Sequence, residues 1–426
     1  MKISVIGLGY VGFPLACAIA KNTNHEIIGV DLDSEKINII QNKKSPIEDE
    51  QAEKDIKEIS FEVSTDDNLL EKTDIFLVCV PTPITEGYLP NLNPVKGATK
   101  TCAKYLKKGG IVVIESTINP GVCEDVVVPI LEEETGMKAG IDFDVAHCPE
   151  RINPGDVKWN VYNIPRNVGA TTPTACKRTA DFYREVLTPK TEVREMNNLK
   201  EAEATKIIEN TFRDINIAYV NELAKSFDKM GIDLNSVIKG ASNKPFAFMP
   251  HFPSCGVGGH CIPVDPYYLI EKARNIGFDH KFLQTARDIN NSMPRYTITR
   301  LEESLEAQEK SLRNTKIGVL GIAYKANIGD MRESPALEII SLLKKKSKKV
   351  EIFDPYCLKE STVQNIEELL SKVDAIILAT NHNDFLSLSA NDLSKNNISC
   401  IVDGKNCLDK NSFQDAGILY KGIGRS

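Results

Sequence analysis

The sequence predicts an α/β protein with two doubly wound domains, joined by a long central helix and a helical dimerisation region. Short apolar runs alternate with helix-like stretches in the first third of the chain, which is typical of buried parallel strands joined by crossover helices. A middle stretch without Gly or Pro predicts one unusually long helix. A second set of apolar runs in the last third predicts another, smaller α/β domain.

The first sheet is expected to use five apolar runs as parallel strands. Each run is short and continuous, as strands buried on both faces are. The predicted strands are Ile3–Ile6, Glu26–Val30, Ile75–Val80, Ile111–Glu115 and Val145–Cys148.

The middle of the chain is predicted to be helical. One continuous helix is expected from Leu199 to Met230, and helical patterns continue to about Leu305. A Pro- and Gly-rich loop from Pro245 to Pro266 interrupts them. Because a long, partly apolar helix can pack against a second copy of itself, we expect at least a homodimer.

The last third is expected to form the second sheet. Its strands are predicted at Lys316–Gly321, Lys349–Phe353, Ala375–Thr380 and Ile398–Val402. The predicted domains are therefore residues 1–196, 197–305 and 306–426.

Composition narrows the class of protein. Among 426 residues, 42% are hydrophobic and 26% charged, which is close to average for a globular protein. A net charge of −7 makes the surface a poor match for nucleic acid or an acidic membrane. Eleven cysteines without a CxxC pair, no signal peptide and no apolar run of membrane-spanning length predict a cytoplasmic protein.

A glycine-rich turn follows the first strand. Gly7, Gly9 and Gly12 form GxGxxG, and Asp31 stands at the end of the second strand. The first two glycines let the backbone approach a pyrophosphate at a helix N-terminus, and Gly12 lets helix and strand pack. Asp31 would accept hydrogen bonds from a ribose 2′-OH and repel a 2′-phosphate, so NAD is favoured over NADP. The alternative is a turn without a ligand.

Two further segments carry reactive side chains. Lys206 and Asn210 are four residues apart on one face of the long helix, where they could stabilise an oxyanion; a solvated lysine is the alternative. Cys261 lies four residues before Asp265 in a glycine-rich loop, where a thiol nucleophile is plausible. His260 could be its base. A buried structural cysteine is the other interpretation.

Polar residues also follow strands of both sheets. Thr117 and Glu150 follow predicted strands at the carboxyl edge, where ligands of open α/β sheets bind. They could hold a water and act as a general base, or be only a helix cap and a surface ion pair. In the second α/β domain, Tyr324, Lys325 and Arg332 would suit a base and two phosphates, although solvated charges are the alternative.

These motifs together resemble the UDP-glucose/GDP-mannose dehydrogenase family over essentially the whole chain. The matching segments, in order, are Gly7–Gly12, Val80–Pro83, Glu115–Thr117, Pro149-Glu150, Lys206 with Asn210, Gly258–Asp265, Tyr324-Lys325 and Asp330-x-Arg332. The resemblance implies a two-step, four-electron oxidation of a sugar C6 hydroxyl that consumes two NAD and one water. It also implies an N-terminal NAD domain, a central dimerising helix and a C-terminal UDP domain.

Residue roles are carried over from that resemblance. Cys261 would attack the C6 aldehyde to give a thiohemiacetal and then a thioester. Lys206 and Asn210 would stabilise oxyanions, Asp265 and Thr117 would orient water or relay protons, and Glu150 would assist thioester hydrolysis. The implied cofactor contacts are Gly7, Gly9, Tyr10, Val11, Gly12, Asp31, Lys36, Pro81, Thr82, Thr117 and Arg332. The implied substrate contacts are Glu150, Arg151, Lys206, Asn210, Phe252, Gly256, Gly258, Tyr324, Lys325 and Lys405.

Within the family, segments 149–156 and 258–266 resemble the branch that oxidises UDP-N-acetylhexosamines for surface polysaccharides such as capsule and O-antigen. UDP-N-acetylglucosamine is favoured, and the mannosamine, galactosamine and glucose analogues are the alternatives. Arg151 replaces an apolar residue of the glucose branch and could donate to the acetamido carbonyl. One departure is His251–Cys255, where many relatives carry Pro-Gly-Pro-Gly.

Two alternative functions would require fewer of these residues and domains. A β-hydroxyacid dehydrogenase shares the NAD turn and a helical Lys/Asn pair but uses no thiol and no third domain. A non-catalytic nucleotide-sugar binding subunit would not require Cys261 or its polar neighbours. Six histidines and dispersed cysteines without ligand spacing predict no metal site.

Overall fold

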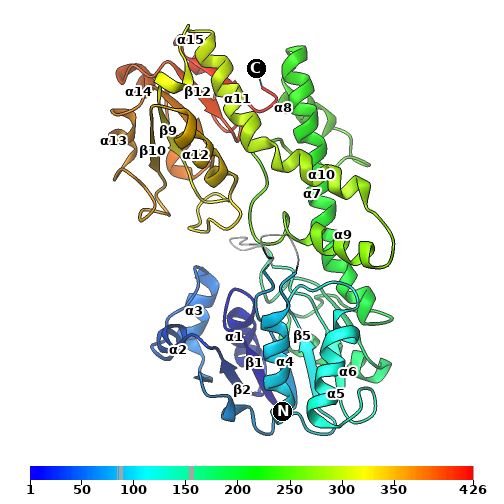
Figure 1. Cartoon of the computed structure of the whole chain (residues 1–426). Helices are drawn as coiled ribbons and strands as arrows, with labels where there is room; N and C mark the ends of the chain where they lie inside the picture. The colour runs from blue at the N-terminus through cyan, green and yellow to red at the C-terminus, as the bar shows by residue number, and fades with distance from the viewer. Residues whose placement is uncertain (84, 86–89, 153–157, 426) are drawn as a thin grey trace. The chain divides into compact units, whose positions relative to one another are not determined.

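The computed structural model describes residues 1–83, 85, 90–152 and 158–425. The chain forms two compact units (Figure 1). The first unit comprises Met1–Glu209 and Tyr267–Gly277, and the second comprises Asn210–Pro266 and Phe278–Ser426. Each unit contains one sheet with helices on both faces, so the predicted fold class is confirmed.

The first unit alternates strands and helices. Its strands are β1 Lys2–Ile6, β2 Glu26–Val30, β3 Glu62–Ser64, β4 Ile75–Val78, β5 Ile111–Ile114, β6 Asp144–His147, β7 Arg166–Ala170 and β8 Val193–Glu195. Its helices are α1 Gly12–Asn22, α2 Ser34–Gln41, α3 Glu50–Glu58, η1 Asp67–Leu70, α4 Asn93–Tyr105, η2 Cys123–Val127, α5 Val128–Thr135 and α6 Pro173–Val186.

The first sheet has the order β3-β2-β1-β4-β5-β6-β7-β8. All neighbouring strands are parallel except β6 and β7. The strand order reverses between β1 and β4, and open α/β sheets bind ligands beyond the carboxyl ends of the strands at such a point. Because β7 runs antiparallel to β6, the residue that begins β7 lies at this same edge.

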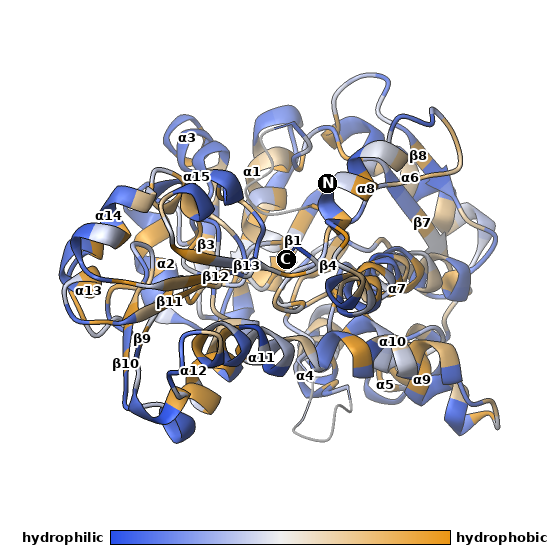
Figure 2. Cartoon of the chain, turned by 90° about the horizontal axis from the view of Figure 1, so that it is seen from above, coloured by the Kyte–Doolittle hydropathy of each residue, from blue (hydrophilic) through white to orange (hydrophobic). Residues whose placement is uncertain are grey.

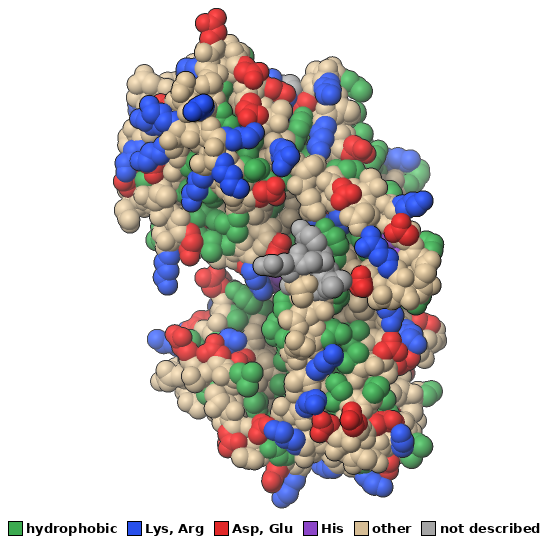
Figure 3. Space-filling model, in the orientation of Figure 1, with side chains coloured by type: hydrophobic (Ala, Val, Ile, Leu, Met, Phe, Trp, Pro, Cys, Tyr) green, Lys and Arg blue, Asp and Glu red, His purple; other side chains and the backbone are tan. Residues whose placement is uncertain are grey.

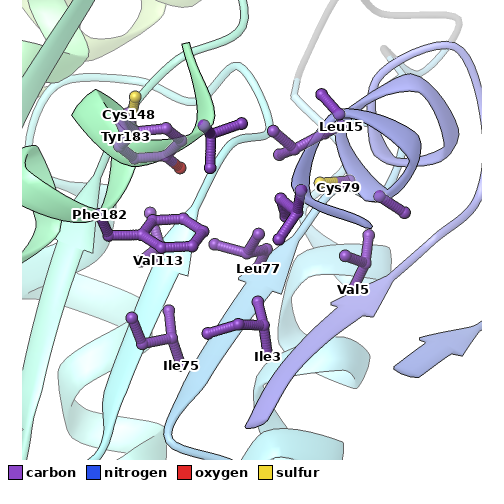
Figure 4. Close-up of a cluster of buried hydrophobic side chains, with 14 of the residues drawn as sticks. Ile3, Val5, Leu15, Ile75, Leu77, Cys79, Val113, Cys148, Phe182 and Tyr183 are labelled. Atoms are coloured by element: carbon purple, nitrogen blue, oxygen red, sulfur yellow. The ribbon is translucent and has the colours of Figure 1, made fainter. Parts of the chain in front are cut away.

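Alternating side chains of the first sheet fill two cores. Ile3, Val5 and Leu77 point to the face covered by α1 and α6, whereas Phe76 and Val78 point to the face covered by α4 and α5 (Figure 4 shows the first of these cores). The short apolar runs of the sequence are therefore strands buried on both sides.

The second unit contains a smaller parallel sheet of order β10-β9-β11-β12-β13. Its strands are β9 Lys316–Leu320, β10 Lys349–Phe353, β11 Ala375–Leu378, β12 Cys400–Asp403 and β13 Leu419–Gly422. Its remaining elements are α8 Leu234–Ala241, α10 Lys281–Asn291, α11 Met293–Glu306, η3 Leu312–Asn314, α12 Pro335–Lys346, α13 Ile366–Leu370, η4 Asn383–Phe385, α14 Ala390–Lys395 and α15 Lys410–Asp415. Strands β11 and β12 are hydrophobic in Figure 2 because helices cover both faces.

Two helices contain the boundary between the units. Helix α7, Leu199–Met230, has the bounds predicted from the sequence, and α9 spans Asp265–Asn275. Within the second unit, α7, α8 and α11 share a small core that includes Val220, Ala224 and Leu234.

Surface properties agree with the composition. Acidic and basic side chains are interspersed on the face seen in Figure 3. Among the described residues, no helix is long and apolar enough to cross a bilayer.

Candidate active site

The turn after β1 needs its glycines for distinct reasons. Gly7 has φ +93°, and a Cβ at Gly12 would lie 1.9 Å from the Gly7 carbonyl oxygen. A Cβ at Gly9 would meet nothing within 4 Å. Gly7 and Gly12 therefore shape the turn and pack α1 against β1, while Gly9 borders open space at the start of α1, which suits a pyrophosphate. Tyr10 and Val11, which complete the predicted turn, are partly exposed.

Asp31 connects the end of β2 to this turn. Its Oδ2 accepts the Leu8 N–H at 2.7 Å, and its Oδ1 accepts the Asp33 N–H at 3.0 Å. Lys36 Nζ lies 3.4 Å from Oδ2. A carboxylate oxygen accepts two hydrogen bonds, so Oδ1 retains a lone pair for a ribose hydroxyl. The predicted NAD residues of β1 and β2 thus lie together and fit the group.

The segments after β4 and β5 are tied to each other. Ser116 Oγ donates to the Val80 carbonyl at 2.6 Å, and the Tyr268 hydroxyl donates to the Thr82 carbonyl. Pro81, Thr82 and Thr117 therefore follow adjacent parallel strands at the carboxyl edge. Thr117 is half-buried and lies outside the helices.

Glu150 is not a surface ion pair, because its side chain is buried with only 6% exposed. Its Oε1 accepts the N–H groups of Arg151 and Ile152 at 2.5 and 2.8 Å, and its Oε2 lies 2.6 Å from Arg166 Nη2. Arg166 also donates to Glu115, which directly follows β5. Three donors thus fix the carboxylate predicted to act as a base.

Arg151 forms a bidentate pair with Glu209 of α7. Its Nε and Nη2 lie 3.1 and 2.5 Å from the two carboxylate oxygens, and Nη1 donates to the Pro165 carbonyl at 3.0 Å. Of five guanidinium N–H groups, the bonds to described residues leave two for a ligand. The predicted segment 149–156 continues into residues 153–156, which lie outside the described residues.

The side chain of Lys206 is buried, with 8% exposed, so the interpretation as a solvated surface lysine does not hold. A buried ammonium is costly to desolvate, which favours a role in binding negative charge.

In the second unit, Asn210 Nδ2 donates to Asp265 Oδ2 at 2.5 Å, and the Asp265 N–H donates to the Cys261 carbonyl at 2.8 Å. The structure therefore brings the helix amide, the carboxylate and the segment of the thiol together. Nine of the eleven cysteines, all of which lie in described positions, are buried, whereas Cys261 and Cys407 are half-buried.

The loop before Cys261 packs on the carboxyl edge of the second sheet. The Cys255 N–H donates to the Gly404 carbonyl at 3.0 Å. A Cβ at Gly256 would lie 2.9 Å from Pro335, and one at Gly258 would lie 2.6 Å from the Cβ of Tyr324. The predicted substrate glycines thus touch the segments after β9 and before α12. Phe252 is exposed at the start of this loop, with 47% of its surface accessible.

Tyr324, Lys325 and Lys405 follow β9 and β12 at that edge. Arg332 pairs with Asp330, with Nη2 2.5 Å from Oδ2. Although burial raises the pKa of Asp330, hydrogen bonds from Arg332 hold it below its usual range. A ligand contact by Arg332 therefore shares its guanidinium with Asp330.

Several site-supporting residues were not predicted from the sequence. Arg166 and Asn221, whose Oδ1 accepts the Ser254 N–H at 3.0 Å, act over long sequence separations and leave no local pattern. The position of Asp354, by contrast, could have been predicted from the sequence. It follows β10 as Asp31 follows β2, and its Oδ2 accepts the Ile322 N–H at 2.6 Å.

No group of three or more His, Cys, Asp or Glu side chains in the described residues is arranged to hold a metal ion.

Comparison with known proteins identifies the family. Models of the UDP-glucose/GDP-mannose dehydrogenase family match in three consecutive parts: the NAD binding domain at residues 1–187, the central domain at 200–292 and the UDP binding domain at 318–410. The UDP-N-acetyl-D-glucosamine 6-dehydrogenase of Pseudomonas aeruginosa is 37% identical over 405 residues, which are 93% of this chain and 94% of the relative.

A second relative matches this chain over its whole length. The UDP-N-acetyl-D-mannosamine dehydrogenase of Pyrococcus horikoshii is 35% identical over 100% of this chain and 99% of its own. The solved structure of UDP-D-ManNAc dehydrogenase from that organism has a TM-score of 0.94 at 34% identity, covering 100% of this chain and 99% of the other. The chain therefore belongs to the UDP-glucose/GDP-mannose dehydrogenase family and is an NAD-dependent nucleotide-sugar dehydrogenase.

Proposed function

We propose that the enzyme oxidises the C6 hydroxyl of a UDP-N-acetylhexosamine to the carboxylate, with UDP-N-acetylglucosamine as the favoured sugar. Relatives named for the glucosamine and mannosamine substrates are 37% and 35% identical, which supports the N-acetylhexosamine class. UDP-N-acetylmannosamine, UDP-N-acetylgalactosamine and UDP-glucose are the alternatives. The product would be a precursor of a surface polysaccharide, and a relative named CapL is 36% identical.

The observation that carries the proposed chemistry is the segment from Cys261 to Asp265, which is held to Asn210 of α7. NAD, when bound, would accept a hydride from C6 in each of the two oxidations. Between them, the Cys261 thiol adds across the C6 aldehyde, giving a thiohemiacetal whose oxidation leaves a thioester. Water then releases the carboxylate, one proton and the Cys261 thiol.

The other side chains are assigned by the charge that they can stabilise. Lys206 and Asn210, one turn apart on α7, would donate to the oxyanion of each tetrahedral species. Asp265 and Thr117 would orient the water or relay protons, and Glu150 would receive a proton from the hydrolytic water.

Binding roles complete the proposal. The cofactor would contact Gly7–Gly12, Asp31, Lys36, Pro81, Thr82, Thr117 and Arg332. The substrate would contact Glu150, Arg151, Lys206, Asn210, Phe252, Gly256, Gly258, Tyr324, Lys325 and Lys405. The open space at Gly9 and the tight packing of Gly258 on Tyr324 support the two sets.

The experiment that tests this function is the molar ratio of NADH formed to sugar consumed, measured for UDP-linked GlcNAc, ManNAc, GalNAc and glucose. We expect a ratio of two for the preferred sugar, with activity abolished in Cys261→Ala. Cys407→Ala is the matched control, because Cys407 is the other half-buried cysteine, and it should retain the ratio and rate. A ratio of one that is indifferent to Cys261 would indicate a simple alcohol dehydrogenase. Binding of sugar without NADH formation would indicate a non-catalytic subunit.

Arg151 is proposed to distinguish N-acetylated sugars through its two remaining N–H groups. Arg151→Leu should raise KM for the N-acetylated substrate by about tenfold, because one or two hydrogen bonds to the acetamido carbonyl are lost. KM for UDP-glucose, which has no such carbonyl, is the internal control. Equal effects on both sugars would assign Arg151 to its pairing with Glu209 alone.

We also propose a homodimer formed through α7. Ile208, Phe212 and Tyr219 follow one another at helical spacings of four and seven, and they are 60%, 46% and 57% exposed. Such an apolar stripe supports an interface with a second copy.

The functional domains are proposed to be residues 1–196, 197–305 and 306–426. The three family models support this division, because each matches within one range. A cytoplasmic location belongs to the same proposal and is supported by eleven described cysteines without a disulfide.

A further inference from the structure

A buried ion cluster holds Glu150 from behind in the first unit. The side chain of Arg166 is 0% exposed, and its Nη1 and Nη2 lie 2.9 and 2.6 Å from Glu115 Oε2 and Glu150 Oε2. The Tyr183 hydroxyl donates to Glu115 Oε1, and the Tyr183 ring centre lies 5.4 Å from Arg166 Cζ. Because solvent is excluded, these charges interact more strongly than surface pairs do.

The members of the cluster come from adjacent elements of one sheet edge. Glu115 follows β5, Glu150 follows β6, Arg166 begins the antiparallel β7 and Tyr183 lies on α6. The thiols of Cys79 and Cys148 also interact electrostatically with Glu115, Glu150 and Arg166. Figure 4 shows Tyr183 beside Cys148.

Glu115 has a pKa near neutral in this cluster. Burial raises the pKa of Glu115 to about 7, with Glu150 adding to the rise and Arg166 opposing it. Burial lowers the pKa of Arg166, but the two carboxylates raise it above its usual value, so the guanidinium stays charged. Burial raises the pKa of Cys79, Cys148 and Tyr183 well above their ordinary values, so they stay protonated.

His147, the last residue of β6 and the neighbour of Cys148, does not belong to the cluster. Successive strand residues point to opposite faces, and Cys148 packs in the core on the α6 side. Burial lowers the pKa of His147 to about 3, so it is neutral.

Hydrogen bonds from the described residues leave Glu150 one free acceptor position. Its Oε1 accepts two backbone N–H groups, and its Oε2 accepts one N–H of Arg166. A carboxylate oxygen accepts two hydrogen bonds, so Oε2 keeps a single lone pair for a water or a substrate hydroxyl. The direction of that lone pair is set by the guanidinium, and the guanidinium is set by Glu115.

We propose that Arg166 and Glu115 are positioning residues that aim the Glu150 carboxylate at the hydrolytic water. The inference rests on the proposed function, in which Glu150 receives the proton of the water that cleaves the Cys261 thioester. Charged Glu115 competes with Glu150 for Arg166 and places a second negative charge beside it, whereas protonated Glu115 does neither. Hydrolysis should therefore respond to the ionisation of Glu115.

The test compares Arg166→Lys, Glu115→Gln and Glu150→Gln in the intact enzyme, with rapid mixing of UDP-N-acetylglucosamine and NAD. We expect the two positioning variants to form two NADH per site in the first turnover and then to hydrolyse the thioester at least about tenfold more slowly. Mass spectrometry of acid-quenched samples should show the acyl adduct on Cys261.

In Glu115→Gln the rise of the hydrolysis rate between pH 6 and 8 should be flattened. Arg184→Lys and Glu192→Gln, which change exposed ion pairs, are matched controls.

The outcomes separate the two levels of inference. Hydrolysis at the wild-type rate and pH profile in Glu115→Gln, with slow hydrolysis in Glu150→Gln, would refute the positioning role alone. Rapid hydrolysis in Glu150→Gln, or no adduct in any variant, would refute the assigned role of Glu150 or of the thioester. Glu115→Gln is nearly isosteric, so it decides the question even where Arg166→Lys does not fold.

Discussion

At the level of single residues, two glycines of the turn after β1 have different surroundings. A Cβ at Gly12 would lie 1.9 Å from the Gly7 oxygen, so Gly12→Ala must displace α1 and should lower Tm as well as NAD affinity. A Cβ at Gly9 has open space within 4 Å, so Gly9→Ala should keep Tm and lose NAD affinity by about tenfold or more. Calorimetry with and without NAD measures both. A lowered Tm in Gly9→Ala, or unaltered NAD affinity there, would contradict this division.

The pKa of Glu115 predicts how the stability of the protein depends on pH. Because burial raises the pKa of Glu115 from 4.5 to about 7 in the folded protein, its protonated form contributes stability that is fully present below pH 4.5 and lost as the pH rises through 7. Glu115→Gln resembles the protonated form at every pH. Its Tm relative to the wild type should therefore rise between pH 5 and 8, measured by thermal unfolding without ligands. A difference that is independent of pH would place the titration elsewhere.

The residues predicted from the sequence are those whose neighbours lie in the same motif. Gly7, Gly12 and Asp31 are fixed by one strand–turn–helix unit, and Cys261 and Asp265 are four residues apart. Arg166 is 16 residues from Glu150 and 51 from Glu115, and it faces them because β7 reverses direction beside β6. Such a contact depends on strand order, which local patterns do not contain.

At the level of elements, Glu203 connects α7 to the segment after β5. Its carboxylate accepts the N–H groups of Gly121 and Cys123, at 2.5 and 2.8 Å, where the helix η2 begins. Glu203→Ala leaves both donors buried without this acceptor and should lower the free energy of unfolding by about 3 kcal/mol. Chemical denaturation measures the change. Glu222→Ala, an exposed position on the same helix, is the control and should differ by less than about 0.5 kcal/mol.

Helices and strands could be predicted where a helical pattern extended over many residues or where a strand was buried along its whole length. The bounds of α7, β2 and β10 agree with the sequence pattern, because each is set by a continuous apolar or helical pattern. Several strands were predicted one or two residues too long at the carboxyl end, as at Val80 and Thr380, since the first loop residues are also buried or apolar. The strands β3, β7, β8 and β13 were not predicted, because β3 and β8 have only three residues each and all four mix polar with apolar residues.

At the level of the whole molecule, both units contain the same hydrogen bond between a strand end and a turn, although their sequences differ. An aspartate that follows the second strand accepts a backbone N–H from the turn after the first strand: Asp31 from Leu8 at 2.7 Å and Asp354 from Ile322 at 2.6 Å. The second turn lacks the complete glycine fingerprint. His382 adds a side-chain contact with Asp354, 3.1 Å from Nε2 to Oδ2. The repeat is thus a property of the fold that the sequence only partly reveals.

Assembly is the last property at this scale, and it depends on the exposed stripe of α7. Phe212→Glu with Tyr219→Glu places two charges on a face that is 46% and 57% exposed at these residues, so the chain should still fold while any apolar interface there is lost. Light scattering coupled to gel filtration should give twice 47.2 kDa for the wild type and 47.2 kDa for the double variant. Arg213→Glu introduces the same side chain at an exposed position about 100° around the helix from Phe212, outside the apolar stripe, and it should remain dimeric. Dimers that persist in the double variant would move the interface away from α7. Since Asn210 lies on the same helix and bonds Asp265, loss of activity in a folded monomer would further show that assembly supports the catalytic segment.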